Sequence, residues 1–368
     1  MIRILHCADL HLDAPFSLKS PRQAERHRTE LRSDLSSVTL LIRTQNIQVC
    51  LMSGDLFDRN EVTPETRSLM EKEFASCPDC TFILAAGNHD PLTDASPYRY
   101  FRFPPNVIVL KPEREVVHLD EWDTDVYGYS FDGKNNAQNP LTGWTIEDPE
   151  RINLLCVHAD VDNPGSPYGP CTKEDIGKSG FDYVALGHVH KGTGLQCENG
   201  VYWAYPGCLE GRGFDETGYK GVLIGTVGKE GADLSFQRIS KRRYEILRCD
   251  ITGCDRAEAL ARARAAVRET GDDTVIRLIL TGEVKEGMIF LPEELVYDGW
   301  MGDDVEVRDE TVLAPDFTEL EENTTLKGVF YRLMKEKIEA GQATEDALKY
   351  GLMALEGRNI VDYGGKQA

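Results

Sequence analysis

Short apolar runs alternate with longer amphipathic segments near the start of the chain. Runs typical of buried strands occur at 2–9, 47–55 and 80–88, and each ends in polar residues. The segments between them, 22–45 and 63–76, repeat apolar residues at helical spacing. Alternating strands and helices predict an α/β fold, in which functional side chains gather at the carboxyl ends of the strands.

Both predicted helices carry further local signals. In the second, Thr63 is placed to cap the first turn, and Pro64 occupies the first helical position, where proline is well tolerated. In the first, the apolar face consists of Leu31, Leu35, Val38 and Ile42.

The pattern changes after residue 91, where strand-like runs follow one another with little helix between them. These runs lie at 106–110, 115–119, 124–130, 151–160, 181–190, 200–207, 220–228 and 233–240. Such a succession indicates a sheet-rich α/β domain, because a simple parallel wound sheet needs a helix at most of its crossovers.

The basic segment SKRRYEILR begins at Ser240, and it predicts a domain boundary near this residue. We expect a first domain over 1–239, a small α+β cap domain over 240–315 and a C-terminal helical segment over 316–368. Within the cap, residues 255–271 form a convincing helix between two strand-like runs. Apolar stripes in the last segment pack on the protein itself or dock another protein; they comprise Val329, Phe330, Leu333 and Ile338, and Leu348, Leu352 and Leu355.

Composition narrows the class of protein. The net charge of −21 argues against a protein that coats nucleic acid by bulk electrostatics, but not against an enzyme that meets phosphates through metal ions. We find no signal peptide and no membrane-spanning run, so we expect a soluble, cytoplasmic protein whose ten cysteines stay reduced. The pair Cys77 and Cys80 fits a redox motif or half a zinc site, and neither interpretation is favoured.

The polar strand ends share one kind of chemistry. Five of the eight histidines lie at these ends, together with aspartates and an asparagine. Residues two apart on an extended segment face the same way, so Asp9 with His11, and His188 with His190, would each form a two-pronged clamp. Imidazole, carboxylate and amide ligands suit a divalent cation such as Mn²⁺, Fe²⁺ or Zn²⁺. The set is Asp9, His11, Asp55, Asp58, Asn88, His89, His158, His188 and His190.

The order of these residues resembles the calcineurin-like metallophosphoesterases. The matching motifs are DLH from residue 9, GDLFD from 54, GNHD from 87, His158, and GHVH from 187, and the resemblance spans about 1–240. Within that superfamily, HCADLHLD, GDLFD and YPGCLEGRGFDETGYKG are similar to the SbcD-type DNA repair exonucleases, and most of all to their YhaO branch. The resemblance implies a β-sandwich core flanked by helices.

It also implies roles for individual residues. Asp55 would bridge two divalent cations, and His89 would face the scissile phosphate, to stabilise the transition state or protonate the leaving oxygen. Asp58 and Asp90 would orient ligands, although some relatives carry histidine in place of Asp58; Arg59 and Arg212 would contact phosphate. The first cation would also take Asp9, His11 and His190, and the second Asn88, His158 and His188.

The resemblance implies a Mn²⁺-dependent DNA exonuclease with single-strand endonuclease activity, in which a water bridging the two cations attacks phosphorus. A phosphatase or phosphodiesterase for small molecules or phosphoproteins is the alternative, and a DNA-end scaffold subunit of an ATPase complex is the second. By resemblance, the partners would be DNA, an SMC-like ABC ATPase of the SbcC type and a second copy of the chain.

Overall fold

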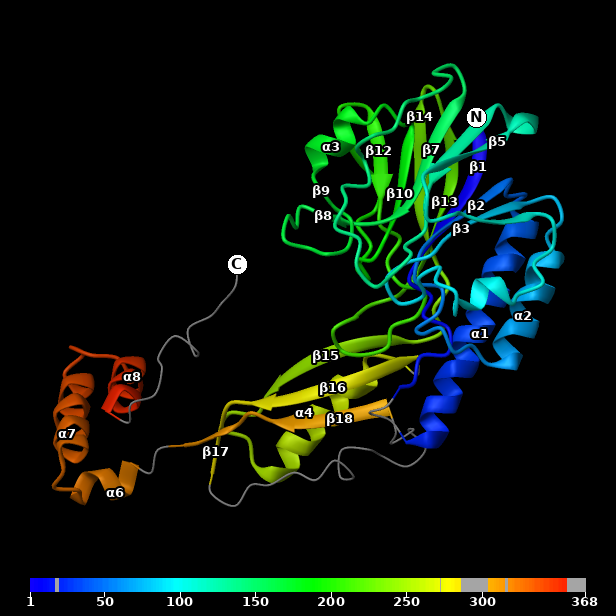
Figure 1. The fold of residues 1–368 in the computed structure, drawn as a ribbon. Helices are drawn as coiled ribbons and strands as arrows, with labels where there is room; N and C mark the ends of the chain where they lie inside the picture. Colours follow the sequence, from blue (N-terminus) through cyan, green and yellow to red (C-terminus); the bar gives the residue numbers. More distant parts are fainter. Residues whose placement is uncertain (17–19, 272, 286–303, 315–316, 356–368) are drawn as a thin grey trace. The chain divides into compact units, whose positions relative to one another are not determined.

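Two six-stranded sheets form the larger part of the computed structural model, which describes residues 1–16, 20–271, 273–285, 304–314 and 317–355. The first sheet has, in order, β14 (Gly231–Arg238), β13 (Gly221–Gly228), β1 (Ile2–Cys7), β2 (Val49–Ser53), β3 (Thr81–Ala85) and β4 (Val107–Val109). The second has β11 (Gln196–Glu198), β12 (Val201–Ala204), β10 (Tyr183–Gly187), β7 (Ile152–His158), β6 (Thr124–Gly128) and β5 (Glu115–Leu119). Figure 1 shows the two sheets, which pack against each other as the layers of a sandwich.

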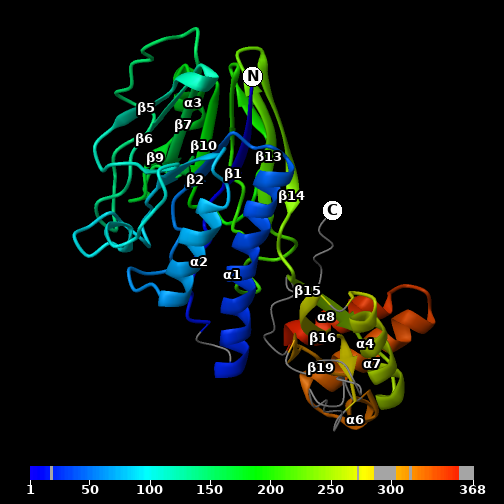
Figure 2. The same ribbon diagram turned by 90° about the vertical axis from the view of Figure 1, so that its right-hand side faces the viewer.

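Alternation of side chains along each strand builds three apolar layers. In β1, Ile2 and Ile4 face the second sheet, whereas Leu5 and Cys7 face outward. The outward face of the first sheet is covered by α1 (Pro21–Thr44) and α2 (Pro64–Ala75), as Figure 2 shows. The second sheet carries the short α3 (Lys173–Lys178) on its outer side. This sandwich flanked by helices confirms the predicted fold class.

The predicted helix signals are present. All four apolar residues foreseen on the first helix are buried in α1, and Thr63 caps α2 by accepting a hydrogen bond from the Thr66 amide. The short elements α3, β8 (Asp160–Val161) and β9 (Pro170–Cys171) were not predicted.

Parallel pairing places the functional strand ends together. β1, β2 and β3 run parallel in the first sheet, as do β7 and β10 in the second. The two sheets are in close contact at these ends. A Cβ atom added at Gly187 of β10 would lie only 1.9 Å from the carbonyl oxygen of Ser53 in β2. The carboxyl ends of five strands therefore meet at one edge of the sandwich.

The remaining elements belong to the predicted cap and helical segments. β15 (Arg243–Asp250), β16 (Thr274–Thr281) and β18 (Val305–Asp309) form a three-stranded sheet, with α4 (Arg256–Arg268) between its first two strands in the chain. β17 (Glu283–Val284) pairs with β19 (Val312–Leu313). The C-terminal helices are α6 (Phe317–Glu322), α7 (Leu326–Glu339) and α8 (Glu345–Leu355).

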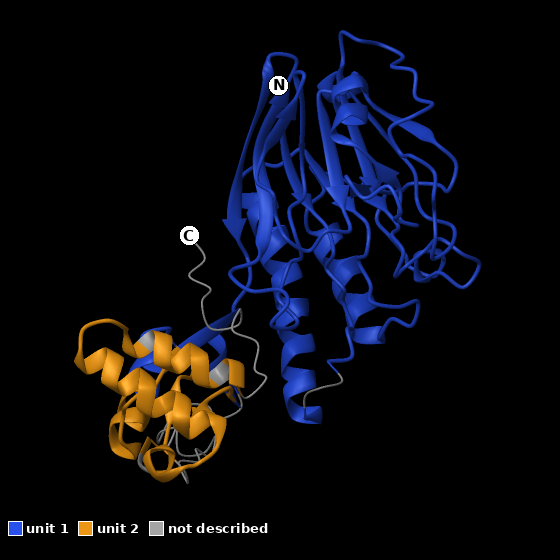
Figure 3. Ribbon diagram, turned by 90° about the vertical axis from the view of Figure 1, so that its left-hand side faces the viewer, with its two compact units in different colours: residues 1–248, 263–279, 292–308 blue, residues 249–262, 280–291, 309–368 orange. Residues whose placement is uncertain are grey.

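Contacts divide the chain into two compact units, coloured in Figure 3. The first comprises 1–248, 263–279 and 292–308, and the second 249–262, 280–291 and 309–368. The three-domain division stays a prediction, and its parts at 286–303, 315–316 and 356–368 lie outside the described residues. Among the described helices, none combines the length and apolarity that crossing a lipid bilayer requires.

Candidate metal centre

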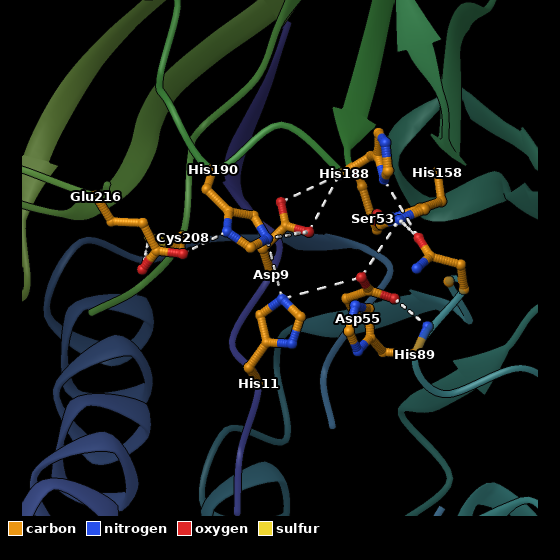
Figure 4. A network of polar contacts seen from close by, with 12 residues as sticks. Asp9, His11, Ser53, Asp55, His89, His158, His188, His190, Cys208 and Glu216 are labelled. Atoms are coloured by element: carbon orange, nitrogen blue, oxygen red, sulfur yellow. Dashed lines mark hydrogen bonds and ion pairs between the residues drawn. The ribbon is translucent and has the colours of Figure 1, made fainter. Parts of the chain in front are cut away.

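Five strand ends bring their polar side chains to one place, shown in Figure 4. Asp9 and His11 follow β1, Asp55 follows β2, and Asn88 and His89 follow β3. His158 is the last residue of β7, and His188 and His190 follow β10. The structure thus brings together residues that are up to 181 positions apart, from Asp9 to His190.

One group of ligand atoms consists of Asp9, His11 and His190. One atom from each lies within 4.8 Å of the other two. The Nε2 atoms of His11 and His190 are 3.1 Å apart, and His190 Nε2 lies 3.9 Å from Asp9 Oδ1. This is the set predicted for the first cation.

A second group lies on the other side of Asp55. Asn88 Oδ1 lies 2.9 Å from His158 Nε2 and 3.2 Å from His188 Nδ1. Asp55 Oδ2 lies 3.5 Å from His158 Nε2 and 3.9 Å from His11 Nε2. Because one Asp55 oxygen approaches a histidine of each group, Asp55 occupies the position that a bridging ligand requires.

The orientation of His158 tests whether the set fits a cation. Its Nδ1–H donates to the carbonyl oxygen of Ser53 at 2.9 Å, so the neutral ring carries its lone pair on Nε2. That lone pair faces the oxygens of Asn88 and Asp55, which are themselves electron-pair donors. Donors that converge in this way repel one another unless a cation lies among them, so the residues fit a divalent metal.

His190 is oriented by a residue that sequence reasoning missed. Its Nδ1–H donates to Glu216 Oε1 at 2.6 Å, and this leaves Nε2 as the ligand atom. Glu216 also accepts from the backbone and the side chain of Arg212. The only sequence signal was its place in the segment YPGCLEGRGFDETGYKG, which carried the family resemblance.

The backbone at the site is strained. Asp9, His11, Asp55 and His188 all have positive φ angles, of 52°, 44°, 52° and 106°. Left-handed conformations cost energy in residues other than glycine, and they persist where the surroundings fix them, often at functional sites. Gly87 is required for a related reason, since a Cβ there would lie 2.2 Å from Asp55 Oδ1.

Burial keeps three of the imidazoles neutral and able to bind metal. It lowers the pKa of His11 to about 4 and that of His188 to about 4, and it also lowers the pKa of His158. Burial would raise the pKa of Asp55, but attraction to His158 and His11 holds it below its usual value. Asp55 is therefore a carboxylate among neutral imidazoles near pH 7.

His89 is exposed and lies at the edge of the site. Its backbone N–H donates to Asp55 Oδ1 at 2.9 Å, which ties its position to the central carboxylate. Its ring lies edge-on to His11, with 4.8 Å between ring centroids, and Nδ1 is 3.3 Å from the carbonyl oxygen of Asp58. A ring held at Nδ1 leaves Nε2 for a substrate.

The two aspartates predicted to orient ligands have different surroundings. Asp58 Oδ1 lies 3.4 Å from His11 Nδ1 and accepts from Arg212 at 3.0 Å. Asp90 is buried and accepts from the amides of Leu56, Phe57 and Gly87 and from the hydroxyl of Tyr98. Asp90 therefore fixes the loops after β2 and β3.

The two predicted phosphate contacts also differ. Arg59 is exposed, and its Nε lies 3.7 Å from Asp58 Oδ2. Arg212 is largely enclosed, and bonds to Asp58 and Glu216 while its Nη2 lies 3.2 Å from His190 Nδ1. Both lie beside the site, and their role toward phosphate stays a prediction.

The cysteine pair lies away from this centre. Cys77 and Cys80 are buried at the end of α2 and before β3, and Cys77 donates to the carbonyl oxygen of Thr39. Burial raises the pKa of Cys80. All ten cysteines are free, and within the described residues no cluster suited to a metal includes this pair.

The fold and the clustered ligands define a metallophosphoesterase. The sequence model described as calcineurin-like phosphoesterase matches residues 2–192, more than half of the chain, and the chain belongs to this family. It is similar, at 27% identity over 308 residues, to the "Uncharacterized metallophosphoesterase YhaO" of Bacillus subtilis (strain 168), with 79% of this chain and 74% of that relative covered. A crystal structure of TT1561 of Thermus thermophilus aligns with 65% of this chain and 100% of its own, at a TM-score of 0.39 and 10% identity.

The match to the family model and the identity with the Bacillus subtilis relative confirm the predicted family and the predicted likeness to YhaO. Family membership implies a hydrolase that acts on phosphoesters with divalent metals.

Proposed function

We propose that the protein is a two-cation phosphodiesterase that cleaves DNA. The observation that carries the hydrolytic part is the convergence of five strand ends on Asp55, with a histidine of each group within 3.9 Å of one of its oxygens. Asp9, His11 and His190 would hold one cation, and Asn88, His158 and His188 the other, with Asp55 shared. Divalent cations at such a site activate water and neutralise charge on the phosphoryl group.

The chain's own residues supply orientation and a proton. Glu216 and the Ser53 carbonyl fix the tautomers of His190 and His158, which keeps their Nε2 atoms directed inward. With Nδ1–H donating to the Asp58 carbonyl, His89 would hold an Nε2 proton toward the leaving oxygen as the doubly protonated imidazolium. Arg59, exposed at the rim, is available to a phosphate beyond the scissile one.

DNA as substrate and Mn²⁺ as native metal are supported by the resemblance to SbcD-type exonucleases. A direct test incubates the purified protein with Mn²⁺, plasmid DNA, end-labelled oligonucleotides and bis-p-nitrophenyl phosphate. We expect cleavage of the DNA from its ends and of single strands, together with the small ester. Cleavage of the small ester alone would contradict the nuclease proposal while leaving the hydrolase intact.

A phosphatase or phosphodiesterase for small molecules or phosphoproteins is the second candidate. The net charge of −21 favours it, since long-range repulsion opposes DNA. A mononucleotide or a phosphopeptide turned over faster than any oligonucleotide in the same assay would establish it. A scaffold subunit for DNA ends is the third candidate, and measurable metal-dependent turnover of any phosphoester would exclude a purely structural role.

We further propose, by the same resemblance, that the protein works in the cytoplasm with an SMC-like ABC ATPase of the SbcC type and as a homodimer. Exposed apolar residues on α7 support a docking face for the ATPase: Leu326, Val329 and Leu333 are 71%, 39% and 55% exposed. Light scattering of the purified chain tests the dimer, for which a mass of about twice 41.2 kDa is expected.

A further inference from the structure

A pocket beside the metal centre has no role in the hydrolytic step proposed above. Its volume is about 570 Å³, within the range of sites that hold small organic groups. It shares Asp58, Arg212 and Glu216 with the network around His190, so whatever occupies it lies next to the reacting phosphate. Every lining residue belongs to the first compact unit.

One wall of the pocket is aromatic. Phe214 meets Tyr244 edge-on at 5.1 Å between ring centroids, and the guanidinium carbon of Arg277 lies 4.0 Å from the centroid of Phe214. Phe16 also lines the pocket, with its ring stacked on His27 at 5.0 Å between centroids.

The polar lining disfavours a phosphate as the occupant. Four carboxylates and two guanidinium groups line the pocket, so its charge is negative at neutral pH. Arg277 is further neutralised by Glu306, at 3.0 Å, and Arg212 by Asp58 and Glu216. A neutral ring with its own donors and acceptors suits this lining better, because carboxylates accept from amino groups and guanidinium groups donate to ring nitrogen or carbonyl oxygen. The carboxylates are those of Asp58, Asp215, Glu216 and Glu306.

We propose that this pocket receives an unpaired nucleobase of a nucleotide that flanks the scissile phosphate. The inference rests on the proposed DNA cleavage and makes it more specific: the enzyme would require a base that has left the double helix. An aromatic wall binds any base by stacking, and the carboxylates add a preference for bases that carry amino groups.

The test compares two single-stranded oligonucleotides that each contain one cleavable phosphodiester among phosphorothioate linkages. One carries normal bases on both sides of that linkage, and the other carries abasic sites there. Loss of stacking on one base is worth about 1–3 kcal/mol, or roughly 5- to 150-fold. We expect Phe214→Ala to reduce kcat/KM by this factor on the normal oligonucleotide, and to leave the abasic oligonucleotide and bis-p-nitrophenyl phosphate unchanged.

Phe236→Ala is the matched control, because Phe236 is 50% exposed on β14 and does not line the pocket. Thermal melting checks folding, and Phe214→Leu, which keeps apolar volume without an aromatic face, replaces the alanine variant if that variant melts early. An equal loss on both oligonucleotides would overturn the pocket proposal alone. Wild-type cleavage of bis-p-nitrophenyl phosphate but of neither oligonucleotide would overturn the DNA proposal and this one with it.

Discussion

Among single residues, His89 has surroundings unlike those of the other histidines at the site. It is exposed, whereas His11 and His158 are buried with pKa values lowered by desolvation. We predict that His89→Ala keeps its bound metal but loses turnover of bis-p-nitrophenyl phosphate by about 10²- to 10⁴-fold, the usual contribution of a positioned acid or base. Metal analysis and turnover are measured on the same sample. His118→Ala, at an exposed histidine on β5, is the control, and an unchanged rate in His89→Ala would refute the assigned role.

Glu216 contacts His190, a predicted cation ligand, and we expect it to orient that imidazole. Removing its charge weakens the hydrogen bond that holds His190 Nδ1, so Glu216→Gln should lower metal affinity by about 10- to 100-fold. At saturating metal, kcat should change much less than the affinity does. Calorimetric titration with Mn²⁺ measures the effect, with Glu230→Gln at an exposed position as control. Equal affinities of variant and wild type would show that Glu216 does not orient the ligand.

The clustering of the candidate metal ligands was predictable because the pattern that they form is local. Asp9 and His11, and likewise His188 and His190, stand two positions apart after an apolar run, and that pattern is visible in the sequence. The partners that orient them were not visible. Ser53 meets His158 across 105 positions, and Glu216 reaches His190 from an irregular loop, so neither contact follows from spacing.

At the scale of elements, α1 carries a buried carboxyl that the site does not use. Burial and repulsion by Glu210 raise the pKa of Asp34 to about 10, so the native protein holds a proton that the unfolded chain releases near pH 4. Native stability therefore falls as the pH rises between these values, by at most about 1.4 kcal/mol per pH unit from this group.

We predict that Asp34→Asn, which cannot ionise, removes that pH dependence. The melting temperature of the variant relative to wild type should rise steadily from pH 5 to pH 9. The control Asp233→Asn, at an exposed position on β14, should track the wild type at every pH. A constant difference between Asp34→Asn and wild type across this range would mean that Asp34 is already ionised in the folded protein.

Helix α7 presents two apolar faces. Tyr331 packs with Leu348 and Leu352 of α8 in one cluster, whereas Leu326 and Leu333 are more than half exposed. We predict that Leu333→Glu leaves the melting temperature within about 1 °C, because exposed substitutions change stability little, but abolishes co-purification with the proposed ATPase partner. Leu40→Glu, at an exposed leucine of α1, is the control. Undiminished co-purification of Leu333→Glu would place the docking face elsewhere.

Elements with several turns or a long apolar run were predicted close to their observed bounds. Helical periodicity predicted α1 and α2, with Thr63 as the cap of α2, and continuous apolar runs predicted β7 and β10. The six-residue α3 and the two-residue β8 and β9 are too short to show a period. For α3, the capping box from Thr172 to Asp175 was the available signal.

For the whole molecule, the pattern of the chain indicated a sheet-rich α/β fold but not the order of its strands. β13 and β14 come late in the sequence yet extend the sheet that β1 begins, because β13 pairs antiparallel with β1. Pairing between strands that are far apart in the sequence cannot be recognised from the residues around either strand. The sandwich was therefore expected from family resemblance, and it is this arrangement that brings five strand ends to one edge.

The most direct test of the account is the metal content of the protein in parallel with its phosphodiesterase rate. After dialysis against Mn²⁺ and desalting, elemental analysis should find two ions per chain in the wild type and fewer in Asp55→Ala. Chelation should abolish hydrolysis of bis-p-nitrophenyl phosphate, and added Mn²⁺ should restore it. A fully active protein that carries no metal after chelation would contradict the claim that these five strand ends form a two-cation hydrolytic centre.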